Sequence, residues 1–324
     1  MLLSETMRFL FATLLAALAG HALAQPVYPT KPIRLVVPFP PGASNDLIAR
    51  AVGQKMSEAL GQQAVVDNRG GAGGSIGAAI LARAPADGYT LMVTSTSYAT
   101  NAAVQTGLPF DPVTDVAGVA MIGRGPMMVV VALSVPAQSM KELIAYAKSQ
   151  AGRVNYTSSG IGSAPHLVTE LFMRQTGIEM VHVPYKGLAP ALTDMVAGRA
   201  QVLIASLPSV LSHVKANRLR GIAITSAQRS PFTPGVPTVS ESGVPGFTSE
   251  LWWGLFAPAR TPAPVIARLN GETRKLVAGS EMKQLLANAG AEPADLSATE
   301  FTALVQNEIA MWRKVARERG IKAE

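Results

Sequence analysis

The stretch "IRLVVPFPPGASNDLIARAVGQKMSEAL" at residues 33–60 decides the fold class. It begins with a short apolar run at 33–39, rich in β-branched residues, which predicts a strand. After a loop that contains Pro and Gly, residues 45–60 repeat an apolar side chain every fourth position. That period predicts an amphipathic helix, which Gly61 ends. A strand followed directly by a helix is the unit from which α/β proteins are built.

The same alternation continues along the chain. Three further runs predict strands, at 64–68, 89–95 and 154–159. Two further segments predict helices because each opens with the Ser-x-x-Glu pattern of a capping box. They are 139–150, with Ser139 and Glu142, and 297–319, with Ser297 and Glu300. We therefore predict an α/β protein with largely parallel sheets.

Two stretches mark candidate domain boundaries. Residues 122–136 contain a long apolar strand between polar segments, and a loop rich in Pro, Gly and Ser at 225–250 precedes a second apolar strand at 251–259. A loop of this length is uncommon inside one compact unit. Two long strands that bracket the middle third fit a discontinuous layout, in which the first and last thirds of the chain form one domain.

The N-terminus has the pattern of a secretory signal peptide. Arg8 precedes an apolar run at 9–19, and the small-x-small sequence ALA follows at 22–24. The apolar run is about half the length that spans a bilayer. We expect export with cleavage after Ala24, and Met7 is an equally suitable start.

Composition excludes several classes of protein. The sequence has no cysteine, so disulfides, thiolate nucleophiles, cysteine-ligated metals and a bacterial lipid anchor are not expected. The formal charge of +7 favours encounter with anions, although a basic balance is also common among exported proteins. Nucleic acid is not an expected partner, because Lys and Arg form no run and aromatic residues make up only 6%.

The sequence nominates no catalytic residue, no metal ligand and no cofactor. Beyond the predicted signal peptide the histidines are His166, His182 and His213, and none is spaced as a metal-binding pair. There is no GxSxG nucleophile elbow. An isolated histidine is more often a packed or hydrogen-bonded core residue than a ligand.

The glycine-rich stretch "RGGAGGSIG" at 69–77 raises the question of phosphate binding. A P-loop needs a lysine, and none occurs between Lys55 and Lys141. A dinucleotide fingerprint needs a third glycine where Ile76 stands. We therefore predict a packed strand-to-helix connection that at most touches the edge of a binding cleft.

Two other loops are better candidates for binding an anion. The loop at 37–46 leads from the first strand into the first helix, with Ser44 or Asn45 as the expected cap. The loop at 158–167 repeats this arrangement, with Ser163 as the expected N-cap and Pro165 in the first turn. Each loop presents backbone N–H groups at the positive end of a helix, which suits a carboxylate or phosphate.

The chain resembles the Bug/TctC family, the extracytoplasmic substrate-binding proteins of tripartite tricarboxylate transporters. The resemblance covers essentially the whole mature chain in order. It is carried by "YPTKPIRLVVPFPPGASND", "VVDNRGGAGGSIGAA", "ADGYTL", "LPFDPVTD", "NYTSSGIGSAPHL", "VHVPYKG", "ALTDMVAG", "LPS", "VPTVSESGVPGF", "WWGLFAPA" and "AEP".

This resemblance implies a two-lobed, periplasmic-binding-protein-like (flytrap) fold whose lobes are joined by crossing strands. The expected crossing strands are 126–133 and 251–257. One lobe would then comprise 25–125 plus 251–324, and the other 126–250, after a signal peptide at 1–24.

The resemblance also implies that a ligand carboxylate is held between the two loops. The family patterns PFxPGGxxD and GxGSxxHL, together with four further pocket positions, nominate substrate-binding residues: Phe39, Pro41, Gly42, Ala43, Ser44, Asp46, Thr96, Ser97, Gly160, Gly162, Ser163, His166, Ser206 and Leu207. The chain departs from the family at Ala43, where a second glycine is usual. It departs again at Ala205-Ser206, where the family commonly has an acidic or amide-bearing pair. The absence of that pair favours a ligand with a less polar tail.

Individual side chains keep alternative roles. Asp46 would orient its own loop, cap the helix, or accept a hydrogen bond from a ligand amine or hydroxyl. Tyr98 lines the distal end of the pocket or packs at its rim.

The expected function is that of a periplasmic, monomeric solute-binding protein. It would capture a small organic carboxylate and deliver it to the membrane permease subunits of a tripartite tricarboxylate transporter. A sensor component that docks on a signalling receptor, or an exported enzyme, is the alternative. Whether the ligand is a di- or tricarboxylate, an amino acid or an aromatic acid is left open.

Overall fold

The computed structural model describes residues 28–150 and 152–321. The predicted signal peptide and its cleavage site lie outside these residues. The chain from Lys31 onward forms one compact unit. Within the described residues, no helix is long and apolar enough to cross a membrane.

The elements alternate as the sequence predicts. The first part of the chain contains β1 (Ile33–Val37), α2 (Ser44–Leu60), β2 (Ala64–Asn68), the 3-10 turn η1 (Ala72–Gly74), α3 (Ser75–Ala82), β3 (Thr90–Ser95), α4 (Ser97–Val104) and β4 (Val116–Ala132). The middle part contains α5 (Met140–Ser149), β5 (Asn155–Ser158), α6 (Ala164–Thr176), β6 (Val181–Pro184), α7 (Leu188–Val196), β7 (Val202–Ser206), α8 (Leu207–Lys215) and β8 (Leu219–Ile224). The last part contains β9 (Glu250–Pro258), α9 (Ala263–Ala278), α10 (Ser280–Ala289), β10 (Glu292–Pro293) and α11 (Ala298–Arg319).

The strands follow the order β2-β1-β3-β9-β4-β7-β5-β6, with β8 and β10 also paired to β4. The outer strands are parallel, as predicted: β1 pairs with β2 and β3, and β5 pairs with β6 and β7. The centre differs from the prediction, because β4 runs antiparallel to its neighbours β9, β7 and β8, and β9 runs antiparallel to β3. The sheet is therefore mixed.

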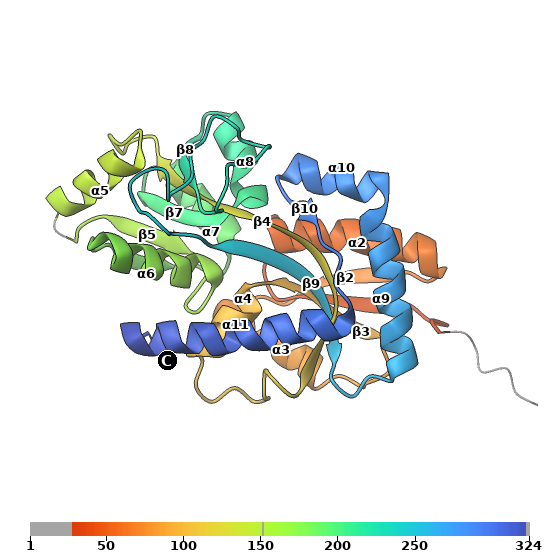
Figure 1. The fold of residues 1–324 in the computed structure, drawn as a ribbon. Coiled ribbons are helices and arrows are strands. Elements are labelled where there is room, and N and C mark those ends of the chain that lie inside the picture. The colour runs from red at the N-terminus through yellow and green to blue at the C-terminus, as the bar shows by residue number, and fades with distance from the viewer. Residues whose placement is uncertain (1–27, 151, 322–324) are drawn as a thin grey trace, which may run out of the picture. The chain divides into compact units, whose positions relative to one another are not determined.

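The two central strands join two lobes (Figure 1). The first lobe carries β1–β3, and the second carries β5–β8. The predicted crossing strands are confirmed, with β9 at the expected place. β4 begins at Val116, ten residues earlier than expected, because residues 116–126 pair with β9 before the strand continues into the second lobe.

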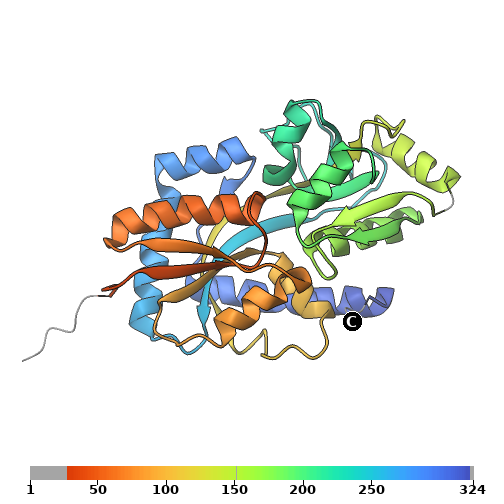
Figure 2. The same ribbon diagram turned by 180° about the vertical axis from the view of Figure 1, so that it is seen from behind.

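The C-terminal helices pack with the first lobe, as Figure 2 shows from behind. α9 contacts α2, and α11 contacts α4 and the crossing strand β4. Phe301 of α11 packs on Trp252 and Phe256 of β9, with ring centroids 5.2 and 5.1 Å apart. These contacts fit the discontinuous layout, while the lobe boundaries at 125/126 and 250/251 stay predictions.

Most of the predicted helix ends are confirmed. Gly61 ends α2 in the left-handed conformation. Ser297 and Glu300 form a complete capping box. Only half of the other box forms: Ser139 accepts a hydrogen bond from the Glu142 N–H, while the Glu142 carboxylate accepts one from Gln138 instead of Ser139.

Candidate functional site

A small cavity lies where the two candidate loops meet. Its volume is about 20 Å³, which is roughly the space that one water molecule requires. It is lined by Phe39, Ala43, Ser44, Asn45, Ser95, Ser97, Ser159, Pro165, Leu188, Ser206 and Leu251. Among the described residues, no Asp, Glu, Lys or Arg lines it. A carboxylate with several carbon atoms enters this space only if the lobes separate.

Five helices begin at this cavity. Ser44, Ser97 and Leu188 are the first residues of α2, α4 and α7, Pro165 is the second residue of α6, and Ser206 directly precedes α8. The first N–H groups of a helix have no partner inside the helix, and the helix dipole makes this end positive. An uncharged cavity surrounded by such ends attracts an anion without any basic side chain.

Serine hydroxyls connect the lobes across the cavity. The Ser44 N–H of the first lobe donates to Ser209 Oγ of the second lobe at 3.1 Å. Ser44 Oγ accepts a hydrogen bond from Ser206 Oγ, also of the second lobe, at 3.0 Å. From the second lobe, the Ala164 N–H at the start of α6 donates to Ser97 Oγ at 3.2 Å. These side chains are short and buried, so small movements of the lobes make or break their hydrogen bonds.

The first loop is held in shape by Asp46. Its carboxylate accepts hydrogen bonds from the Gly42 N–H at 3.0 Å, from Asn68 at 3.0 Å and from Arg50 at 3.1 Å. Burial by itself raises the pKa of Asp46, but the hydrogen bonds from Arg50, Gly42 and Asn68 outweigh burial and lower that pKa below its ordinary value. Of the three roles open to Asp46, the structure therefore supports orientation of its own loop.

The expected cap of α2 is wrong. The N-cap position belongs to Ala43, whose side chain makes no capping hydrogen bond. Ser44 is instead the first helical residue and turns its hydroxyl toward Ser206 and Trp253. The side chain of Pro41 lies outside the cavity lining, as does Gly42, whose φ of +96° provides the turn.

The second loop folds on its own backbone. Ser163 is the N-cap of α6, as predicted, and Pro165 lies in the first turn. The Ser163 hydroxyl donates to the Gly160 carbonyl at 2.7 Å and does not cap the helix. Gly160 and Gly162 adopt φ values of +122° and +80°, so both glycines serve the shape of the loop.

His166 lies behind the second loop, outside the cavity lining. Its Nδ1 accepts a hydrogen bond from the Gly162 N–H at 3.2 Å, and its ring stacks on His182 at 4.1 Å between centroids. His182 in turn lies 2.6 Å from Ser158 Oγ. Burial lowers the pKa of His166 to about 4. The pKa of His182 is also lowered to about 4, mostly by burial and to a smaller extent by the nearby His166. Both rings are neutral supports of the loop at pH 7.

Other predicted positions face neighbouring elements. Thr96 exchanges hydrogen bonds with the Trp252 backbone and so fixes β9. Leu207 and Ala205 belong to the apolar core of the second lobe, so the Ala205 departure does not change the cavity wall. Tyr98 is buried and donates to the Pro112 carbonyl at 2.7 Å.

The structure therefore brings five predicted residues to the cavity and places nine elsewhere. Phe39, Ala43, Ser44, Ser97 and Ser206 line it, whereas Pro41, Gly42, Asp46, Thr96, Gly160, Gly162, Ser163, His166 and Leu207 do not. As lining residues, sequence reasoning missed Asn45, Ser95, Ser159, Pro165, Leu188 and Leu251. Ser95 ends β3 and Ser159 directly follows β5, which is a usable signal, because ligands of α/β sheets bind at the carboxyl ends of strands.

The glycine-rich stretch is a packed connection, as predicted, and it also reaches the other lobe. A Cβ on Gly70 or Gly77 would lie 2.9 or 2.6 Å from the Pro40 and Pro38 side chains. A Cβ on Gly73 would lie 2.3 Å from the Ile161 carbonyl oxygen. The backbones of the two lobes therefore touch here.

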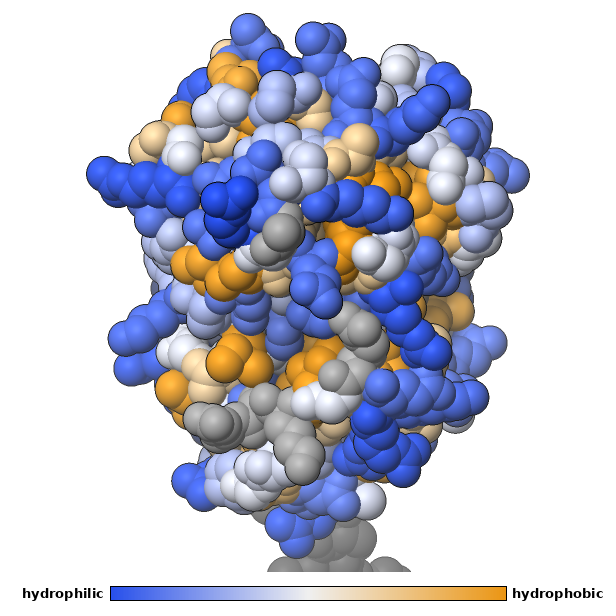
Figure 3. All heavy atoms as spheres, turned by 90° about the vertical axis from the view of Figure 1, so that its left-hand side faces the viewer, coloured by the Kyte–Doolittle hydropathy of each residue, from blue (hydrophilic) through white to orange (hydrophobic). Residues whose placement is uncertain are grey.

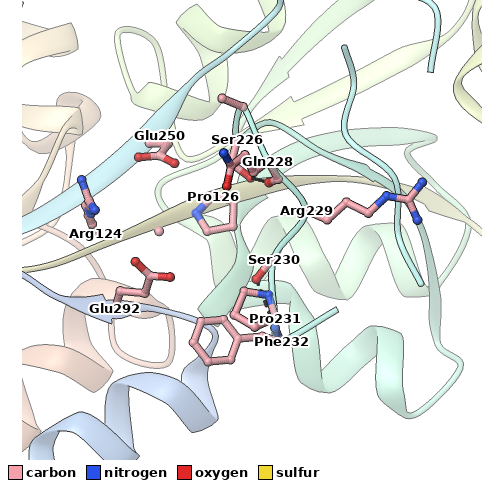
Figure 4. A pocket seen from close by; sticks show the side chains of 12 residues that line it. Arg124, Pro126, Ser226, Gln228, Arg229, Ser230, Pro231, Phe232, Glu250 and Glu292 are labelled. Carbon is pink, nitrogen blue, oxygen red and sulfur yellow. Dashed lines mark hydrogen bonds between the residues drawn. The ribbon is translucent and has the colours of Figure 1, made fainter. Parts of the chain in front are cut away.

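A larger cavity of about 340 Å³ lies on the opposite face of the crossing strands (Figure 4). Glu250 of β9 lines it, whereas the next residue, Leu251, lines the small cavity, and successive strand residues point to opposite faces. Arg124 stands between Glu250 and Glu292 in Figure 4. Two arginines, Arg124 and Arg229, and two glutamates, Glu250 and Glu292, line this cavity, so its lining has no net positive charge to attract an anionic ligand.

Comparisons with known proteins show which family the chain belongs to. The family model for the tripartite tricarboxylate transporter family receptor, TctC, matches residues 48–321. The chain belongs to this family. Protein BugT of Bordetella pertussis is 36% identical to this receptor over 311 residues, which cover 94% of this chain and 95% of BugT.

Two solved structures show the same fold as the receptor. An R. palustris protein solved with adipate is 38% identical, with a TM-score of 0.88, and the match covers 91% of this chain and 99% of that one. MatC from Rhodopseudomonas palustris, solved with bound malate, is 29% identical, with a TM-score of 0.85 and coverage of 89% and 99%. The receptor is thus a two-lobed α/β protein of a substrate-binding family, as the sequence motifs indicate.

Proposed function

We propose that the receptor captures a small organic carboxylate between its lobes and delivers it to the membrane permease subunits of a tripartite tricarboxylate transporter. The single observation that carries this proposal is the convergence of five helix N-termini on one cavity without charged side chains. That arrangement suits a carboxylate, which accepts several hydrogen bonds from fixed N–H and O–H donors.

The expected affinity follows from those donors. Three or four hydrogen bonds to a charged group contribute about 1.5–3 kcal/mol each. Their sum of about 4.5–12 kcal/mol spans the roughly 8 kcal/mol that corresponds to micromolar affinity, and the cost of closing the lobes is subtracted from it. The hydroxyls that now link Ser44 to Ser206 and Ser97 to Ala164 are the groups that a ligand carboxylate would engage.

We further propose that the receptor works as a monomer in the periplasm and is not an enzyme. In the face seen in Figure 3, hydrophobic residues form separate groups among hydrophilic ones, which supports a monomer. The predicted signal peptide supports the location. His166 accepts its hydrogen bond from the Gly162 N–H, and the Ser163 hydroxyl donates to the Gly160 carbonyl, so these two residues do not form a nucleophile–base pair.

A thermal-shift screen with small carboxylates tests the proposal. A ligand at 100 times its Kd stabilises the folded state by about 2.7 kcal/mol, and the melting temperature rises accordingly. The matched control is the neutral amide of each acid that binds, which has the same carbon skeleton and lacks the charge. We expect the acid to raise the melting temperature and the amide to leave it unchanged.

Two results would contradict the proposal. One is a screen in which no carboxylate raises the melting temperature. The other is chemical conversion of a bound acid or its ester by the purified protein, which would make the receptor an enzyme.

A further inference from the structure

One polar side chain at the cavity lacks a partner. Asn45 is 8% exposed and lines the cavity, and its Oδ1 is buried without a hydrogen bond among the residues that the structure describes. A buried amide oxygen without a partner is destabilising, and in native proteins such atoms are rare. Asn45 is the second residue of α2 and caps nothing, so helix formation does not account for it.

The neighbouring polar groups already have partners. The Ser44 N–H donates to Ser209, and both oxygens of Asp46 accept hydrogen bonds from within the first lobe. Asn45 is therefore free to bind a ligand where Asp46 is not. Its position beside the first N–H groups of α2 puts the amide next to the place where a carboxylate would be held.

The chemistry of the partner follows from the amide. An amide carries one acceptor and one donor group, and which of the two faces the cavity depends on the rotation of the side chain. A hydroxyl both donates and accepts, so it satisfies either orientation. An ammonium group only donates and carries a charge, and no carboxylate lines the cavity to balance that charge.

We propose that Asn45 makes the receptor selective for carboxylates that carry a hydroxyl on the carbon next to the carboxylate. This inference rests on the proposed function and names the ligand class. The carboxylate lies at the helix N-termini, and the neighbouring hydroxyl pairs with the Asn45 amide. Acids without this hydroxyl leave the amide unpaired, and amino acids bring an ammonium group that the cavity does not balance.

Matched ligands and variants test the proposal by calorimetry. The probes are malate, succinate and aspartate, which share one carbon skeleton, and the pairs lactate/propionate and mandelate/phenylacetate. Asn45→Leu removes the amide at similar volume. Asn307→Leu is the control, because Asn307 is exposed on α11 on the other side of the crossing strands.

We expect the wild type to bind the hydroxy acid of its best pair at least about fivefold more tightly than the acid without the hydroxyl. That ratio corresponds to one hydrogen bond of about 1 kcal/mol. In Asn45→Leu the ratio falls to about one while the affinity for the acid without the hydroxyl is retained. Asn307→Leu keeps the wild-type ratio.

Three results would overturn the inference: equal wild-type affinity for both acids of the pair, a ratio that survives Asn45→Leu, or aspartate binding as tightly as malate. The first of these needs no variant, so the test does not depend on the folding of Asn45→Leu. If an acid binds without preference for the hydroxyl, the proposed function stands and this inference fails. If none of these acids binds while another carboxylate raises the melting temperature in the thermal-shift screen, this inference fails and the proposed function stands.

Discussion

Replacing Gly73 with alanine tests how the lobes close. Gly73 adopts φ +64° in the glycine-rich stretch of the first lobe. A Cβ there would lie 2.3 Å from the carbonyl oxygen of Ile161 in the second lobe and 2.5 Å from the Asn101 amide. The Asn101 side chain can turn away, but the Ile161 carbonyl belongs to the backbone. The added methyl group therefore forces the two loops apart.

The size of the effect follows from the distances. A carbon and an oxygen in contact need about 3.3 Å, so the loops must separate by about 1 Å. The hydrogen bond from Ala164 to Ser97 is already 3.2 Å long, and the one from Ser44 to Ser209 is 3.1 Å. Both would exceed hydrogen-bonding distance. Losing two hydrogen bonds at about 0.5–1.5 kcal/mol each raises the free energy of the closed state by about 1–3 kcal/mol. A ligand carboxylate that engages the same groups in place of these bonds meets the same displacement of about 1 Å and loses contacts of similar strength, so its affinity falls by about 5- to 150-fold.

Calorimetry with the carboxylate that gives the largest thermal shift measures this loss. Gly61→Ala is the matched control, because Gly61 has a similar φ of +68° and a Cβ there meets nothing within 4 Å. Both variants lose stability through backbone strain, but only Gly73→Ala loses affinity. Unchanged affinity in Gly73→Ala, or an equal loss in both variants, would refute the reasoning.

Two further predictions concern pH. His166 and His182 have native pKa values of about 4, below the unfolded value near 6.5, so the unfolded state binds more protons between these values. The free energy of unfolding should therefore fall as pH drops from 6.5 to 4, by at most about 3 kcal/mol per histidine, and His166→Gln should flatten this slope in urea titrations. Glu308 accepts a hydrogen bond from Trp252, and burial raises the pKa of its carboxyl group from 4.5 to about 7. The folded state therefore binds more protons than the unfolded state between these values, and the free energy of unfolding falls as pH rises from 4.5 to 7. Glu308→Gln should gain up to about 3 kcal/mol relative to the wild type at pH 8 and nothing at pH 4, and an equal effect at both pH values would contradict this.

Local patterns were sufficient to predict most of the secondary structure. The period of four in residues 45–60 and the stop at Gly61 predict α2 within one residue of its start. The direction of β4 and β9 in the sheet carries no such signal, because an antiparallel and a parallel strand have the same period. The mixed centre of the sheet was therefore not predictable from these runs.

The candidate site was predictable at the level of loops and less so at the level of side chains. The helix-start pattern located both loops, but it does not show which way each side chain turns. Asp46 and His166 look like ligand-binding groups in the sequence, and local hydrogen bonds to Gly42 and Gly162 direct them into their own loops. Leu251 reaches the cavity from the far end of the chain, through strand pairing that only the fold reveals.

A crystal structure of the receptor with the best carboxylate from the thermal-shift screen tests the central claim most directly. The account predicts the ligand carboxylate between the starts of α2 and α6, within about 2.7–3.1 Å of backbone N–H and serine hydroxyl groups. Density for the ligand in the cavity beside Arg124, Glu250 and Glu292 instead would contradict it.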